Sequence, residues 1–170
     1  GGKGRRPLRR SWAVAASILL LVGAGSGGWF LWSNRVPTAA AAIVETAGPV
    51  KITQSGQPLR NCRSDGELVR VGDILSTPEA DGAIRLDDAT RLALRQGCRL
   101  EAQPPAAEGQ AAFVLREGSV CVDTTQAKRG CRVETPAGTV RCGKARTLIR
   151  VTSPQESTVA TLDGEVEVQC

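Results

Sequence analysis

Six cysteines are the residues of this 170-residue chain with the most chemistry available to them. Outside the reducing cytoplasm an even number of cysteines favours disulfides, whereas buried free cysteines act as small hydrophobic side chains. No two of them form a C-x-x-C pair, and the chain has no histidine, so we expect no bound metal. We predict at least one disulfide among Cys62, Cys98, Cys121, Cys131, Cys142 and Cys170.

The most specific disulfide candidate joins Cys131 to Cys142. A hairpin that turns at Pro136-Ala137 would place Cys131 opposite Cys142 and Val133 opposite Val140, with all four side chains on one face. Opposed Cβ atoms lie about 4.5–5.5 Å apart, which is close to disulfide reach. The alternative is a solenoid in which the two strands pair with other neighbours, so that each cysteine finds another partner.

Catalysis has few candidate residues in this sequence. The chain contains no histidine and no tyrosine, so the commonest general base is absent. No nucleophile-elbow, Walker or dinucleotide-binding glycine motif follows a strand and opens a helix. Asp87-Asp88 is an adjacent acidic pair, but neighbours on a strand face opposite ways, which favours a solvated turn. We therefore expect a protein that is not an enzyme and that binds no cofactor.

One long apolar segment precedes all the cysteines. Residues 12–32 carry no charge, and a helix of that length reaches roughly 31 Å, close to the thickness of a bilayer core. We predict a single transmembrane helix over residues 12–32. The alternative is a cleaved signal peptide, whose apolar run is normally shorter. The residues expected to anchor the helix in the two membrane interfaces are Trp12, Trp29, Phe30, Trp32, Arg9 and Arg10.

The net charge of +5 arises at the N-terminal end of the chain. Residues 1–11 hold five basic side chains and no acid, and from residue 33 onward 17 basic residues balance 17 acidic ones. This asymmetry gives no support to nucleic-acid binding, and the positive-inside rule places residues 1–11 in the cytoplasm. We expect a bacterial inner-membrane protein with a basic cytoplasmic tail, a contact with the lipid bilayer and a periplasmic C-terminal domain.

Small residues cluster in the second half of the predicted helix. Gly23 and Gly27 form a G-x-x-x-G pair, and Ala24 and Gly28 repeat this spacing one residue further on. Residues four apart lie on one helix face, so another helix could approach closely there. The alternative is the general enrichment of glycine in membrane helices. We predict a helix-packing interface at Gly23, Gly27 and Gly28, with another integral membrane subunit as the partner.

The rest of the chain is predicted to be mainly β. Residues 33–38 form a short linker, and over residues 39–170 apolar and polar residues alternate in short runs. Turn signals such as Asp163-Gly164 separate these runs and indicate a twisted β-sandwich or a short β-solenoid. The predicted core residues are Ile84, Leu86, Leu92, Leu94, Val114, Val133, Val140, Val166 and Val168.

A series of segments in this β domain follows a recognisable order. The segments are residues 68–75, 82–88, 90–94, 113–120, 133–141 and 162–168, and the most specific contains Thr135-Pro136-Ala137-Gly138. The series resembles the FecR-like domain, the periplasmic β domain of bacterial membrane-anchored regulators. The resemblance departs at Gly143-Lys144-Ala145-Arg146, where the family usually has Gly-Thr-x-Phe, and the missing aromatic residue is expected to alter the local core.

Two functions fit these observations. Family members that control sigma factors carry a folded cytoplasmic segment, for which residues 1–11 are too short. We therefore expect a structural or accessory subunit of a larger inner-membrane complex, such as a respiratory or photosynthetic one, whose periplasmic domain contacts partner subunits. The alternative is a FecR-type signal relay or anti-sigma regulator that senses an envelope partner.

Overall fold

The computed structural model describes residues 39–54, 57–62, 66–106 and 109–170, and every element in them is a β-strand. The mainly-β class is therefore confirmed. Within these residues no helix is long and apolar enough to cross a membrane. The predicted membrane helix falls outside the described residues, together with its anchors and its packing face, namely Arg9, Arg10, Trp12, Gly23, Gly27, Gly28, Trp29, Phe30 and Trp32.

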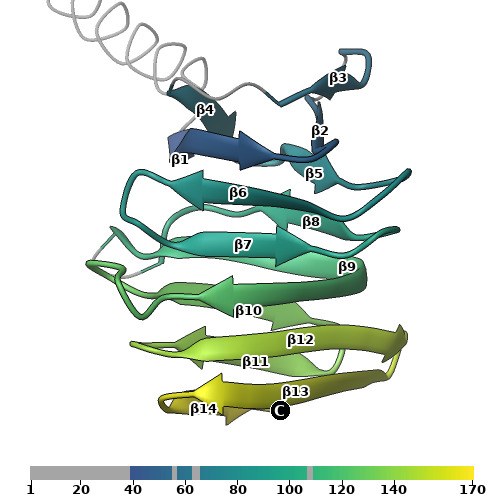
Figure 1. Cartoon of the computed structure of the whole chain (residues 1–170). Coiled ribbons are helices and arrows are strands. Elements are labelled where there is room, and N and C mark those ends of the chain that lie inside the picture. Colours follow the sequence, from purple (N-terminus) through teal and green to yellow (C-terminus); the bar gives the residue numbers. More distant parts are fainter. Residues whose placement is uncertain (1–38, 55–56, 63–65, 107–108) are drawn as a thin grey trace, which may run out of the picture. The chain divides into compact units, whose positions relative to one another are not determined.

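The fourteen strands of the described residues form one continuous sheet that curls into two layers (Figure 1). The first layer contains, in spatial order, β4 (Glu67–Arg70), β1 (Ala39–Ala47), β6 (Gly82–Leu86), β7 (Arg91–Leu94), the second half of β9 (Ala111–Asp123), β12 (Arg146–Ser153) and β13 (Glu156–Asp163). The second layer contains β3 (Arg60–Asn61), β2 (Lys51–Thr53), β5 (Ile74–Ser76), β8 (Arg99–Ala102), the first half of β9, β10 (Cys131–Thr135), β11 (Gly138–Cys142) and β14 (Val166–Gln169).

Strand β9 joins the two layers by bending at Gly118. Its first half pairs with β8 and β10, and its second half pairs with β7 and β12. Gly118 has a φ of +81°, and a Cβ atom there would lie 2.8 Å from the Cα atom of Cys98. Glycine permits both the positive φ and this close backbone approach, so the sheet can fold over at this position.

The inward faces of the two layers enclose one hydrophobic core. Strand β6 alternates strictly between buried and half-buried residues, as a strand with one core-facing side should. Leu86 and Leu92 come from the first layer, Leu100 and Leu115 come from the second, and all four are fully buried. Phe113 is the largest fully buried side chain, so the core contains an aromatic residue although the usual family position lacks one.

Most of the predicted core residues are buried: Ile84, Leu86, Leu92, Leu94, Val133 and Val140. The prediction was wrong for Val114, which is half-buried because β9 turns Phe113 and Leu115 inward on either side of it. It was also wrong for Val168, which is 47% exposed. Val166 packs against the core but is only partly buried. Both residues lie on β14, which among the described strands pairs only with β11, so one side of it is uncovered.

Candidate protein-docking site

An apolar stripe crosses the outer face of the first layer. Strand pairing places Ala47 opposite Ala83, Ala83 opposite Ala93, Ala93 opposite Cys121 and Cys121 opposite Leu148. The row then continues to Ala160 on β13. Strands in a sheet are spaced about 4.8 Å apart, so a row across six strands is about 24 Å long.

The middle of this stripe is hollow because its side chains are small. The alanine side chains extend only a short way from the sheet, whereas the longer side chains in the rows on either side extend further. The resulting depression encloses about 580 Å³, and the exposed Leu162 closes one end. We call it the apolar groove and define it by Ala47, Ala83, Ala93, Cys121, Leu148 and Leu162. Because it is open to solvent and rimmed by polar residues, we treat this apolar surface as a candidate protein-binding site.

One rim of the apolar groove is a row of charged residues from six neighbouring strands. Strand pairing brings them into line as Glu45, Arg85, Arg91, Asp123, Arg146 and Asp163. The guanidinium of Arg85 contacts Glu45 at 2.8 Å. The guanidinium of Arg146 donates two hydrogen bonds to one carboxylate oxygen of Asp123, at 3.0 and 2.8 Å.

Among the three arginines of this rim, Arg91 has the spare hydrogen-bonding capacity. It lies directly opposite Arg85 on one side and Asp123 on the other. The carboxylates of Glu45 and Asp123 are already bonded to Arg85 and Arg146, and within the described part of the chain Arg91 makes no ion pair. A carboxylate brought by a partner would relieve the repulsion between two opposed arginines.

The opposite rim contains an ion pair between Arg95 and Asp81 at 2.6 Å. Asp81 also accepts a hydrogen bond from the backbone N–H of Gln96 at 2.8 Å. These two hydrogen bonds hold the pKa of the Asp81 carboxyl below its ordinary value, the bond from Arg95 being the stronger cause. The rim is therefore charged at neutral pH, so a ligand of the groove would meet charges on both sides.

Cys121 lies in the floor of the apolar groove. Partial burial raises the pKa of its thiol, although the nearby Arg146 guanidinium acts in the opposite direction. A thiol with a raised pKa is protonated at neutral pH and is a poor nucleophile. Cys121 therefore contributes an apolar contact surface, and the groove offers shape and charge for binding with no group prepared for chemistry.

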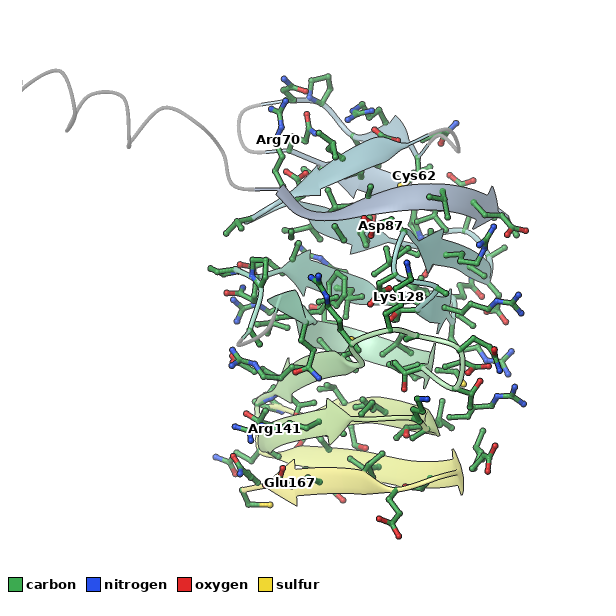
Figure 2. The ribbon with its side chains drawn as sticks, turned by 90° about the vertical axis from the view of Figure 1, so that its left-hand side faces the viewer. Cys62, Arg70, Asp87, Lys128, Arg141 and Glu167 are labelled. Carbon is green, nitrogen blue, oxygen red and sulfur yellow. The ribbon has the colours of Figure 1, made fainter. Side chains whose placement is uncertain are left out.

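A second depression of about 400 Å³ lies where the β6–β7 turn meets the loops after β8 and β9. Figure 2 shows Asp87 and Lys128 close together on this side of the domain. Asp88 closes its own turn, because its carboxylate accepts hydrogen bonds from the backbone N–H and the hydroxyl of Thr90, at 2.9 and 3.0 Å. The acidic pair thus lies in a turn, as predicted, and this depression has a lining of polar and apolar residues with mixed charge.

Two polar residues of the resemblance motifs close turns. Asp73 is almost fully buried, and its carboxylate accepts the backbone N–H of Arg70 at 2.8 Å, which closes the β4–β5 turn. In the β10–β11 turn the hydroxyl of Thr135 donates to the backbone oxygen of Gly138 at 3.0 Å. These hydrogen bonds fix turns of the fold, whereas other residues of the same segments, Ala83, Ala93 and Leu162, line the apolar groove.

Comparison with protein families gives a match between residues 73–167 and the model described as FecR protein. The chain belongs to the FecR family. The matched residues extend from the β4–β5 turn into β14 and include the groove positions from Ala83 to Leu162. Neither the comparison with curated proteins nor that with solved structures gives a match.

Of the site residues predicted from the sequence, only the proposed disulfide pair lies in the described residues of the FecR domain, and the fold brings its two cysteines together. Cys131 pairs directly with Cys142 in the antiparallel β10–β11 hairpin, so the solenoid alternative, with other partners for these two strands, was wrong. All six cysteines are present as free thiols, so the disulfide itself stays a prediction. Elsewhere burial raises the pKa of both Cys62 and Cys98 to about 12, which fits the alternative of small hydrophobic side chains.

The apolar groove of the FecR domain is absent from the features predicted from the sequence. Two strands carried a usable signal, an apolar residue at the centre of a charged–x–apolar–x–charged pattern. These segments are residues 91–95, centred on Ala93, and residues 146–150, centred on Leu148. Their outward positions alone do not show that strands from different parts of the chain bring these centres into one row.

Proposed function

We propose that this chain is a FecR-type signal relay whose β domain senses an envelope protein through the apolar groove. The observation that carries the proposal is the family match over residues 73–167. FecR domains resemble those of membrane-anchored regulators, so the family match supports a role in signalling. The groove adds a surface through which a partner protein could be recognised.

The chemistry of the groove suits a protein ligand. Its floor is apolar and about 24 Å long by the strand spacing, which is long enough for a segment of several residues. Both rims carry charges, and Arg91 is available to a partner carboxylate. An apolar centre with charged edges resembles the usual layout of protein–protein interfaces, in which the rim contributes specificity.

The proposal includes the placement of the domain in the cell. An uncharged segment of 21 residues with a basic N-terminal flank supports one membrane crossing, with the β domain in the periplasm. The absence of histidine and tyrosine from the sequence supports a role without catalysis and without a cofactor. The family match gives no support to a subunit of a respiratory or photosynthetic complex, so the relay replaces that hypothesis.

Site-specific photocross-linking in living cells tests where the partner binds. A photoreactive amino acid at Ala93, which is exposed in the groove floor, should capture one envelope protein. The matched control is the same amino acid at Ala137, an alanine in the β10–β11 turn of the second layer. Identical cross-linked products at both positions, or none at Ala93, would contradict the proposed binding site.

Charge-reversal variants test whether the charged rim of the groove contributes to partner binding. Arg91→Glu should weaken capture at Ala93, because it removes the free guanidinium and places a carboxylate next to Asp123. Arg99→Glu, which changes another exposed arginine on β8 of the second layer, should leave capture unchanged. Equal effects of the two variants would show that charge on the groove rim does not select the partner.

A further inference from the structure

The two ends of the curled sheet differ in how their edge strands are protected. At one end the edges are β3 and β4, which have two and four residues. Arg60 on β3 forms an ion pair with Glu67 on β4, which ties these two edges together. Short, charged edge strands resist pairing with another chain.

The other end has an edge strand of a different kind. Strand β13 has eight residues and, among the described strands, pairs only with β12 (Figure 1). Its two charged residues, Glu156 and Asp163, stand at its ends, and the six residues between them are uncharged and include no proline. Among them, Leu162 is 62% exposed. A long, uncharged edge that no other described strand covers is the kind that accepts another strand.

We propose that β13 is a self-association edge, through which two copies of this chain pair as antiparallel strands about a twofold axis. This inference is independent of the groove's partner. Residues directly opposite each other in an antiparallel pair share one face of the sheet. The residue of β13 through which the twofold axis passes therefore sets which residues of the two copies lie opposite each other.

The register centred on Ala160 fits the side chains. It places Ala160 opposite its own copy, Val159 opposite Thr161 and Thr158 opposite Leu162. None of these pairs opposes two like charges, so the strand is self-complementary over the uncharged segment. The pairing would also join the two apolar stripes, because Ala160 continues the row from Leu148 in each copy.

The test is a charge swap at Ala160, measured by sedimentation of the full chain in detergent. Ala160→Lys alone and Ala160→Glu alone each place like charges opposite each other, so each should weaken the dimer by about fivefold, the equivalent of one like-charge pair. An equal mixture of the two variants should restore dimers, since lysine then faces glutamate. Gln96→Lys, an exposed position in the β7–β8 turn, is the control and should dimerise as the wild type does.

Each other outcome counts against the proposal. A wild-type chain that stays monomeric, or a mixture that does not recover, would overturn pairing centred on Ala160. If Leu68→Lys on β4 abolishes association while the Ala160 variants do not, the contact is made through the opposite end of the sheet and the proposal is wrong. Circular dichroism of each variant confirms that the β domain is folded, so loss of dimer is not mistaken for unfolding.

Discussion

Cys131 lies directly opposite Cys142 across the β10–β11 hairpin, and both side chains are fully buried. Burial raises the pKa of both thiols, and in Cys142 the hydroxyl of Thr147 acts in the opposite direction. The neighbouring pair on the same face is Val133 and Val140. The two sulfur atoms therefore project into the core from facing positions on adjacent strands.

We predict that Cys131 and Cys142 form a disulfide when the chain folds in an oxidising compartment. The loop that they enclose is short, so the bridge should stabilise the domain by at most about 3 kcal/mol in the loop-entropy estimate. Thermal unfolding with and without reductant measures this difference, and the Cys131→Ser/Cys142→Ser double variant should remove it. Peptide mapping without reductant that recovers the two cysteines in separate, unlinked peptides would rule the bridge out.

Gly118 should be essential to the bend that joins the two layers. Gly118→Ala places a Cβ atom 2.8 Å from the Cα of Cys98 at a φ of +81°, which should cost about 1–3 kcal/mol or more in the free energy of unfolding. The control is Gly143→Ala, where a Cβ meets nothing within 4 Å; this variant should stay within about 0.5 kcal/mol of the wild type. Urea unfolding measures both, and equal losses would contradict a special role for Gly118.

Val140 and Val168 are direct partners on β11 and β14, yet they differ in burial. Val140 is 1% exposed and Val168 is 47% exposed. Val140→Ala should therefore lower the free energy of unfolding by about 2 kcal/mol, and Val168→Ala by less than about 1 kcal/mol. Chemical denaturation of the two variants compares them, and a larger loss at Val168 would mean that β14 is covered in solution.

Asp123 should make the domain sensitive to acid. Partial burial acts to raise the pKa of its carboxyl, but hydrogen bonds from Thr125 and Arg146 outweigh this effect and hold the pKa below its ordinary value. Because the folded-state pKa is lowered, the stabilisation is present above about pH 4 and is lost as the pH falls through the folded-state pKa. The contribution of Asp123 to the free energy of unfolding should be below about 1 kcal/mol, since its partner Arg146 is half exposed. Urea unfolding between pH 7 and pH 3 should show a smaller pH dependence for Asp123→Asn, and an unchanged profile would contradict this assignment.

Local pattern was enough to predict the class of fold and the β10–β11 hairpin. Period-two alternation identified Ile84, Leu86, Leu92 and Leu94 as core residues, and a turn at Pro136-Ala137 gave the observed register. These features depend on neighbours in the sequence, so the sequence contains what is needed to find them.

The errors at Val168 and at the groove concern features that depend on distant strands. Val168 alternates as a core residue should, but its exposure follows from the position of β14 at the edge of the second layer. The groove could not be derived because Ala93, Cys121 and Leu148 meet only through the register between β7, β9 and β12. Register between strands far apart in sequence is set by the packing of the whole core.

The most direct test of the proposed relay is transcript profiling of the host cell by RNA sequencing. Deletion of the chain should change a defined set of transcripts, and Ala93→Arg, which fills the groove of a folded domain, should change the same set. Ala137→Arg makes the same substitution in the β10–β11 turn and should match the wild type. If deletion of the chain changes no defined set of transcripts, or if Ala93→Arg and Ala137→Arg give the same profile, the account of a signal relay that reads a partner through the groove is contradicted.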